Sequence, residues 1–167
     1  RWLKRRSVGV EIGAFKKPIP GIRPFYVDRF SEYAGESCLG DYWGDATHLP
    51  FHDNSLDFVA TSHVLEHVAN PIAALLEWHR VLRSGGLIYA VVPDRRYTFD
   101  HARAVTDFEH MWTDYVDHVT QRDLTHTEEF ITRVDWSSYS PATPSEEITQ
   151  RQREWLDLQR RYVAEGG

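Results

Sequence analysis

The clearest hydrophobic pattern in the chain lies between Leu56 and Asp94. A short apolar run over 56–61 is typical of a buried strand, and the continuous apolar run over 87–92 is typical of a strand covered on both faces. Between these runs, apolar residues recur at helical spacing, at Ile72, Leu75, Leu76 and Leu82. The stretch therefore predicts a strand–helix–strand unit with parallel strands and a right-handed crossover.

Both ends of this predicted helix carry recognisable signals. Asn70 is a favourable N-cap residue, and Pro71 suits the first helical position, where its missing N–H costs no intrahelical bond. Arg80 and Arg83 fall in the predicted last turn, where cations interact favourably with the helix dipole. The pair Gly85-Gly86 is expected to end the helix.

Shorter apolar segments precede this unit. They predict strands over 7–12, 25–27 and 42–43. The segment 14–24 contains three prolines and a glycine, which exclude an ordinary long helix. The segment 29–40 holds few apolar residues and is interpreted as a loop or a short helix.

After Asp94 the pattern changes: residues 95–101 are polar and aromatic without a period, and helical spacing begins at Thr106. Three pairs of a threonine with a glutamate three residues later are typical helix starts: Thr106–Glu109, Thr125–Glu128 and Thr143–Glu146. The segment 135–144, rich in serine and proline, is expected to be a loop. The sequence therefore predicts an α/β fold with four or five short strands, one clear crossover helix and a C-terminal helical appendage.

Charge and cysteine content narrow the function classes. The 167 residues carry a formal net charge of -6 at pH 7, which argues against nucleic acid as the main partner, because phosphate binding favours a basic surface. The concentrated positive charge at Arg1–Arg6 is interpreted as a solvated chain end. The single cysteine, Cys38, excludes an internal disulfide and a multi-cysteine zinc site, and it favours a cytoplasmic location.

The sequence also lacks targeting signals. No run approaches the roughly 18 apolar residues of a membrane helix, and the first residues lack the apolar core of a signal peptide. Since the sequence does not begin with methionine, we expect it to be a fragment or a trimmed chain.

Acidic residues are predicted at the carboxyl ends of three strands: Glu11, Asp28 and Asp45. In an open parallel sheet, ligands bind beyond these strand ends. A carboxylate at the end of the second strand can accept hydrogen bonds from both hydroxyl groups of a ribose. The acids therefore favour a nucleoside-containing ligand at this edge.

Several segments resemble motifs of the class I S-adenosylmethionine-dependent methyltransferases of the type 11 kind. They are GVEIGAF at 9–15, YVDRF at 26–30, GDATHLPF at 44–51 and the long block at 56–94. The resemblance covers about residues 7–100 and implies a Rossmann-like open parallel sheet with strand order 3-2-1-4-5. The later run VVPDRRYTFDHARAVTDFEH looks like a subgroup found among bacterial glycan and cell-surface biosynthesis proteins.

This resemblance implies S-adenosyl-L-methionine as the cofactor and assigns its parts to the strand ends. The implied contacts are Glu11 and Gly13 for the methionine part, Asp28 for the ribose, Asp45 and Ala46 for the adenine, and Ser62 and His63 facing the sulfonium and the acceptor. Residues 1–100 would then form the cofactor-binding core, and residues 101–167 a helical acceptor region of the same domain.

The chain departs from the family pattern in three places. Phe15 stands where the first motif usually has a second glycine, and the Pro-rich segment 16–24 replaces the helix that normally follows. The antiparallel hairpin that normally completes the sheet is expected to be missing. A missing hairpin leaves an exposed sheet edge, so the fragment is expected either to be less stable or less active than the full protein or to pair with a partner, such as a second copy in a homodimer.

His63, Glu66 and His67 allow three interpretations. His-Val-Leu-Glu-His is formally a zinc-protease signature, but that motif needs a helix, and here it follows a strand, so we predict no metal. His63 could instead take a proton from an acceptor hydroxyl. In the third interpretation, Glu66 and His67 only form local hydrogen bonds.

The acceptor is predicted to lie near Asp94, Arg96 and Tyr97, where Arg96 could bind a carboxylate or phosphate. The sequence thus predicts a methyltransferase that acts on a small molecule or glycan, with O-methylation preferred and His63 as its base. The alternative is a catalytically inactive domain of the same fold that binds or scaffolds. A nicotinamide oxidoreductase is disfavoured, because the chain lacks the Gly-x-Gly-x-x-Gly turn.

Overall fold

The computed structural model describes residues 7–33, 35–101, 103–139 and 143–164. The chain forms two compact units, Arg1–Val92 and Pro93–Gly167, and each is described by itself. The charged cluster Arg1–Arg6 lies outside the described residues. The sequence-based division at residue 100 stays a prediction.

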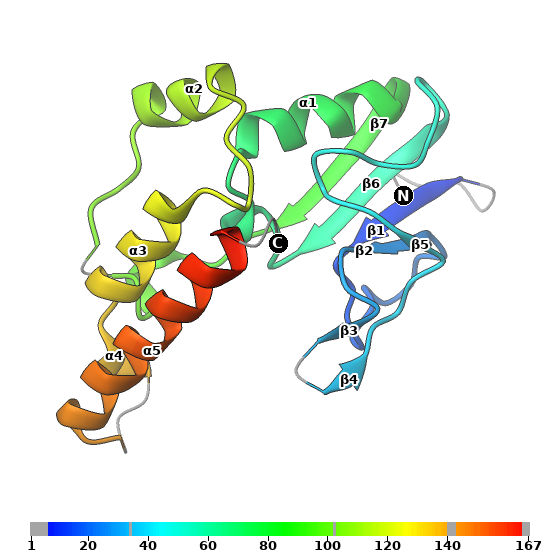
Figure 1. Cartoon of the computed structure of the whole chain (residues 1–167). Helices are drawn as coiled ribbons and strands as arrows, with labels where there is room; N and C mark the ends of the chain where they lie inside the picture. Colours follow the sequence, from blue (N-terminus) through cyan, green and yellow to red (C-terminus); the bar gives the residue numbers. More distant parts are fainter. Residues whose placement is uncertain (1–6, 34, 102, 140–142, 165–167) are drawn as a thin grey trace. The chain divides into compact units, whose positions relative to one another are not determined.

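The first unit is built on a parallel sheet of five strands (Figure 1). The strands are β1 (Gly9–Ile12), β2 (Phe25–Asp28), β5 (Tyr42–Trp43), β6 (Leu56–Ser62) and β7 (Leu82–Val91), in the spatial order β5-β2-β1-β6-β7. Counted along the chain, this is the order 3-2-1-4-5 that the family resemblance implied. The α/β fold class and the parallel crossover are confirmed.

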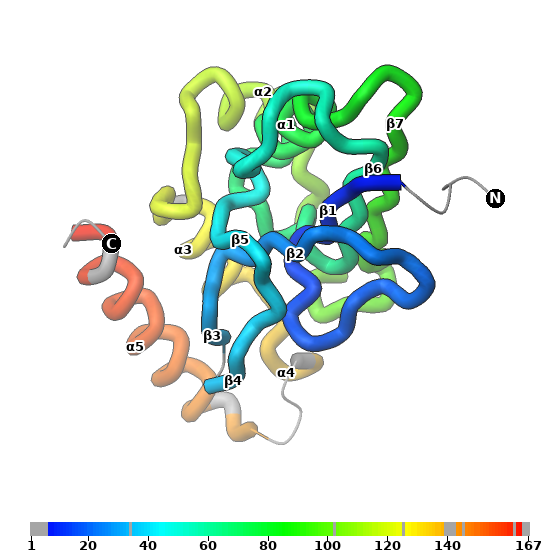
Figure 2. Tube along the Cα trace, turned by 90° about the vertical axis from the view of Figure 1, so that its right-hand side faces the viewer, coloured from blue at the N-terminus to red at the C-terminus, as the bar shows by residue number. Residues whose placement is uncertain are grey.

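One detail of this unit was not predicted. The segment expected to be a loop or short helix instead forms a small antiparallel pair, β3 (Glu32–Tyr33) and β4 (Glu36–Ser37). The two strands lie side by side apart from the main sheet (Figure 2). All four residues are exposed, so hydrophobic periodicity carries no signal for this pair.

Apolar side chains from the central strands and the crossover helix form the core of this unit. They come from Val10, Ile12, Val27, Leu56, Val59, Ala74, Trp78 and Val81, with Ala46, Leu49 and Leu82. The largest side chain in this core, Trp78, is fully buried. The Pro-rich segment 14–24 contains no helix, as predicted.

The crossover helix α1 (Pro71–Val81) begins as the sequence predicts. The Asn70 side chain accepts a hydrogen bond from the Ala73 N–H at 2.9 Å, and Pro71 occupies the first turn. The predicted end is wrong, because the helix stops at Val81 and Arg83 lies in β7. The chain enters the sheet at once, since Leu82 already pairs with Leu56.

Gly85 and Gly86 lie at an irregularity within β7 and do not terminate the helix. Phe58 pairs with Leu87, so the register shifts relative to the Leu56–Leu82 pair. Gly85 has φ 78°, a conformation that favours glycine. A Cβ on Gly86 would lie 2.9 Å from the Arg83 carbonyl oxygen.

The expected burial of β7 is also wrong. The strand lies at the edge of the sheet, and β6 is its only partner among the described strands. Leu87, Ile88 and Tyr89 are 37%, 36% and 51% exposed. The apolar run identified the strand correctly but not its surroundings, because an apolar side chain marks β-propensity as well as burial.

Two neighbouring side chains of α1 hold the loop that follows β5 by hydrogen bonds to its backbone. The Trp78 Nε1–H donates to the Ala46 carbonyl at 2.9 Å, and the Glu77 carboxylate accepts from the Leu49 N–H at 2.6 Å. Arg80 donates to both oxygens of Glu77 at 2.7 Å and to Asp53 at 2.6 Å. Burial alone raises the pKa of Glu77, but the bonds from Arg80 and Leu49 outweigh it and lower that pKa.

The second unit is helical (Figure 1). Its elements are the 3₁₀ turn η2 (Arg95–Tyr97) and the helices α2 (Phe108–Val116), α3 (Leu124–Arg133), α4 (Trp136–Tyr139) and α5 (Ser145–Ala164). α3 and α5 pack side by side, and an Arg160–Glu128 ion pair at 2.7 Å links them. No helix in the described part of the chain is both long and apolar enough to span a membrane.

Three helix boundaries of this unit differ from the prediction. Asp107, not Thr106, caps α2, because its carboxylate accepts the His110 N–H at 2.8 Å. α3 starts one residue before Thr125, which is therefore helical and not a cap. The expected loop after residue 134 contains α4, whose start is stabilised by Asp135 accepting hydrogen bonds from two serines.

We predict that Glu77→Gln lowers the free energy of unfolding by about 1–3 kcal/mol at pH 7, since a buried charged acceptor is lost. The folded pKa of Glu77 lies below its ordinary value of 4.5, so the carboxylate stabilises the fold above that pH. This contribution disappears as the pH falls through the folded pKa. Urea denaturation at pH 7 and below pH 4.5 measures both effects.

The matched control is Glu32→Gln, which changes an exposed glutamate on β3. It is expected to change stability by less than about 0.5 kcal/mol at either pH. Equal stability of Glu77→Gln and the wild type at pH 7 would refute the claim that the Glu77 carboxylate stabilises the loop after β5.

Candidate functional site

The carboxyl ends of the central strands lie level with one another. Ile12 of β1 pairs with Val27 of β2 on one side and with Thr61 of β6 on the other. The next residues along the chain, Gly13, Asp28 and Ser62, therefore lie at the same edge of the sheet. The structure thus brings together the strand-end residues that the sequence singled out.

Glu11 is fully buried within β1. Its Oε1 accepts a hydrogen bond from the Ile19 N–H at 2.9 Å, which folds the Pro-rich segment back onto the strand. Its Oε2 is buried and has no hydrogen-bond partner among the described residues. Burial raises the pKa of Glu11, and the bond from Ile19 offsets part of this effect.

Gly13 makes the tight turn out of β1. It has φ 69°, and its N–H donates to the Val27 carbonyl at 2.9 Å. A Cβ at this position would lie only 2.4 Å from Val64 Cγ2. The turn therefore requires glycine for its backbone conformation and for space.

Phe15, at the position of the second family glycine, has φ 48°. The backbone thus keeps a left-handed conformation that glycine adopts without penalty, and Phe15 adopts it with strain. Its carbonyl accepts the Leu39 N–H at 2.7 Å, and its ring packs edge-on against Tyr33 at 6.1 Å. Both contacts lie on the side of β3 and β4.

Asp28 ends β2 and is 9% exposed. Its Oδ1 accepts the Phe30 N–H at 3.1 Å, and its carbonyl accepts the Gly44 N–H at 3.0 Å. Its Oδ2 accepts no hydrogen bond from a described residue. One carboxylate oxygen at this strand end is therefore available to a ligand.

Asp45 and Ala46 follow β5. Asp45 Oδ1 accepts hydrogen bonds from the N–H and the hydroxyl of Thr47, at 2.9 and 2.7 Å. Arg29 Nε lies 4.0 Å from Asp45 Oδ2. The Ala46 carbonyl accepts a hydrogen bond from the Trp78 Nε1–H.

Ser62 ends β6, and His63 follows it. The His63 N–H donates to the Val91 carbonyl at 2.9 Å, and its backbone has φ 57°. Its Nδ1 lies 3.2 Å from Glu66 Oε1, while 61% of the imidazole side chain is exposed. A carboxylate on Nδ1 orients the ring and leaves Nε2 to accept a proton.

The predicted acceptor residues belong to the second unit. Arg96 donates three hydrogen bonds to the Asp94 carboxylate, at 2.5 to 3.1 Å. These bonds lower the pKa of Asp94. Tyr97 is 85% exposed, and the Arg96 guanidinium lies 5.7 Å from its ring centre. An acceptor that binds Arg96 would therefore have to compete with Asp94.

The strand-end residues fit a nucleoside cofactor such as S-adenosylmethionine. The orphaned Glu11 Oε2 and the available Asp28 Oδ2 are acceptors for ligand hydroxyl or amine groups. At Gly13 the backbone lies so close to the Val64 side chain that a Cβ has no room, so glycine is needed to form the turn beside these acceptors. Sequence reasoning missed the contribution of Ile19 and Trp78, because nothing in their local pattern reveals a distant hydrogen-bond partner.

Part of the chain is similar to known methyltransferases. Residues 29–90 match the family model described as Methyltransferase domain. A 45-residue segment is 49% identical to demethylmenaquinone methyltransferase of Staphylococcus epidermidis, covering 27% of this chain and 19% of that protein. An uncharacterized 37.1 kDa protein in a transposon of Streptomyces fradiae is 49% identical over 51 residues, 30% of this chain and 15% of that protein.

Part of the chain is also similar to solved structures. A methyltransferase of Thermotoga maritima, described as a possible histamine N-methyltransferase, has 26% identity and a TM-score of 0.44, over 59% of this chain and 50% of that one. The matched segment spans about a fifth of the length of the first curated relatives. The family match confirms the resemblance to class I methyltransferases.

We predict that Gly13→Ala destabilises the protein more than Gly21→Ala does. Both glycines have positive φ, which costs alanine about 1–2 kcal/mol, but Gly21 has nothing within 4 Å of its Cβ position. The contact with Val64 should add about 1–3 kcal/mol for Gly13→Ala. Urea denaturation of the two variants measures the difference, and equal destabilisation would contradict the close packing under the turn.

Proposed function

Because residues 29–90 match the methyltransferase-domain family, we propose that the chain is an S-adenosylmethionine-dependent methyltransferase that modifies a hydroxyl group of a small molecule or glycan. The observation that carries the proposal is the acidic strand-end pair. Glu11 keeps one buried oxygen without a partner, and Asp28 on the adjacent strand keeps one oxygen available. A buried acceptor without a donor is costly, and ligand donors remove that cost.

S-adenosylmethionine supplies a methyl group activated by a positively charged sulfur. The residues proposed to hold the cofactor are Glu11 and Gly13 for the methionine part, Asp28 for the ribose, Asp45 and Ala46 for the adenine, and Ser62 and His63 next to the methyl group. These residues act by orienting the reactants and excluding water. These residues do not have to activate the methyl group, because the positively charged sulfur of the donor already does so.

A hydroxyl acceptor must lose its proton during methyl transfer. His63 is the proposed base, and Glu66 positions it, since Glu66 Oε1 lies 3.2 Å from Nδ1. The exposed side chain makes Nε2 reachable for an acceptor from solution. This support for acid–base work favours the second of the three interpretations of His63.

The choice of acceptor rests on the subgroup resemblance. Asp94, Arg96 and Tyr97 are proposed to contact it, with the exposed Tyr97 ring and the Arg96 guanidinium suited to a sugar or an anionic group. The cytoplasmic location and the homodimer stay predictions.

We predict that the full chain binds S-adenosylhomocysteine and that Asp28→Ala weakens this binding by about 1.5–3 kcal/mol, the range for hydrogen bonds to a charged group. Isothermal titration calorimetry measures both affinities. Asp41→Ala is the matched control, since the Asp41 carboxylate also accepts one backbone N–H, that of Tyr26 at 2.9 Å.

The control should bind like the wild type. No heat of binding at millimolar ligand from the folded wild-type chain would instead support the alternative of an inactive scaffold domain with this fold. Unchanged affinity in Asp28→Ala would remove Asp28 from the ribose role.

We predict that His63→Asn slows methylation of a hydroxyl acceptor by about 10²–10⁴-fold, because the general base is lost. Asparagine tolerates the positive φ of this position, so the fold should be kept. Turnover is measured across pH, with any phenol or sugar that the wild type methylates in a panel. His67→Asn, in the adjoining 3₁₀ turn η1 (Leu65–His67), is the control. Unaltered turnover of His63→Asn would exclude the base role.

A further inference from the structure

Three side chains of the second unit converge on one point. His110 and Asp114 lie one turn apart on α2, and His126 lies in the first turn of α3. His110 Nε2 is 3.5 Å from Asp114 Oδ2, and His126 Nε2 is 3.2 Å from the same oxygen. One ligand atom from each residue lies within 4.8 Å of the others.

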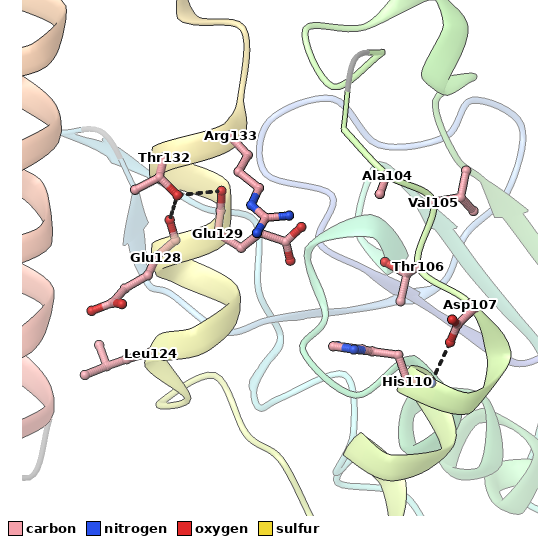
Figure 3. A pocket seen from close by; sticks show the side chains of 10 residues that line it. All are labelled: Ala104, Val105, Thr106, Asp107, His110, Leu124, Glu128, Glu129, Thr132 and Arg133. Atoms are coloured by element: carbon pink, nitrogen blue, oxygen red, sulfur yellow. Dashed lines mark hydrogen bonds between the residues drawn. The ribbon is translucent and has the colours of Figure 1, made fainter.

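The local structure explains this convergence. Asp107 caps α2 by accepting the His110 N–H, and this fixes the helical turn that carries His110 (Figure 3). At the other end of α2, His118 has φ 53°, and the Val119 N–H donates to the Asp114 carbonyl at 2.9 Å. With the 3.3 Å bond from the His118 N–H to the Tyr115 carbonyl, this is a Schellman motif, which ends the helix and lets the chain turn toward α3.

The His126–Asp114 distance would suit either a hydrogen bond or a shared metal ion, whereas the His110–Asp114 distance favours the metal ion. A good N–H···O bond measures about 2.7–3.2 Å, so the 3.5 Å separation of His110 and Asp114 is too long. Two ligands of a tetrahedral zinc ion, each about 2.0–2.2 Å from the metal, lie about 3.4 Å apart. Both measured separations are close to that value.

The chemistry of the set agrees with its geometry. Asp114 is 8% exposed, and a carboxylate in that position is stabilised by a nearby cation. The His110 and His126 rings stand nearly perpendicular, at 76° with centres 5.2 Å apart, so they do not stack face to face. Two imidazole nitrogens with one carboxylate oxygen are a common ligand set for divalent transition metals.

We propose that His110, Asp114 and His126 form a binding site for a divalent transition-metal ion, with zinc as the favoured ion. This proposal does not depend on the methyltransferase activity, and it differs from our sequence-based expectation of no metal. Three protein ligands leave a fourth position of a tetrahedral ion to water or another small ligand.

His110 also lines a cavity of about 580 Å³ between the start of α2 and α3 (Figure 3). Glu128, Glu129 and Arg133 of α3 lie on the cavity wall as well. An ion held by His110 would therefore border a polar cavity large enough for a small molecule.

The test uses the full chain after treatment with a chelator and removal of that chelator. Calorimetric titration with Zn²⁺ is expected to give one equivalent per chain, and Co²⁺ should give the visible absorption bands of a tetrahedral ion. His110→Ala and His126→Ala should each weaken Zn²⁺ binding by about 100-fold or more, since even indirect partners of metal ligands contribute 10–100-fold.

The control is His118→Asn, which removes a nearby imidazole while keeping a residue that tolerates positive φ. It should bind Zn²⁺ like the wild type. Imidazole nitrogen NMR of the wild type needs no variant, and Zn²⁺ should shift the Nε2 signals of His110 and His126. Absence of binding by the folded chain, full affinity in both alanine variants, or shifts confined to other histidines would overturn the proposal.

Discussion

The buried carboxylate of Glu77 is the constraint on which the arrangement of the strand ends depends. It holds the Leu49 N–H and two donors of Arg80, while its neighbour Trp78 holds the Ala46 carbonyl. These bonds connect the crossover helix to the loop after β5. The strand β5 itself has only two residues. The bonds from α1 add to the pairing of β5 with β2 and to the bond from the Gly44 N–H to the Asp28 carbonyl, which hold Asp45 and Ala46 beside the end of β2. The side chains with which α1 packs against this loop thus also help to place the candidate site.

Left-handed backbone marks the points where the chain leaves the sheet. Gly13 and Phe15 follow β1, and His63 follows β6, all with φ between 48° and 69°. Such conformations are costly for Phe15 and His63, and they persist only where the surrounding structure determines them. Here the hydrogen bonds of Gly13 to Val27 and of His63 to Val91 end neighbouring strand pairs. The result is a level edge with acidic side chains and an imidazole beside it.

Much of the first unit was predictable from the sequence, for local reasons. Asn70-Pro71 is a strong helix start, and apolar runs located the strands of the main sheet. The end of α1 was not predictable, because Leu82 pairs with Leu56 before the helical pattern stops, and this pairing is a tertiary interaction. Similarly, the β3–β4 pair consists of exposed residues and leaves no periodic signal.

The candidate sites divide in the same way. Glu11, Gly13, Asp28 and Asp45 could be named because strand ends are readable and because the segments resemble a known family. The orphaned oxygen of Glu11 and the Glu66 contact of His63 required coordinates. The His110–Asp114–His126 cluster was not predicted, since His126 reaches Asp114 only after a Schellman turn whose geometry the sequence does not announce.

The central claim is that a nucleoside cofactor binds at the carboxyl edge of the sheet, and an amide NMR titration of the full chain with S-adenosylhomocysteine tests it most directly. We expect chemical-shift changes concentrated at Gly13, Asp28, Ala46 and His63, with the signals of α5 unchanged. A folded chain whose spectrum does not respond, or responds only within residues 93–167, would contradict it.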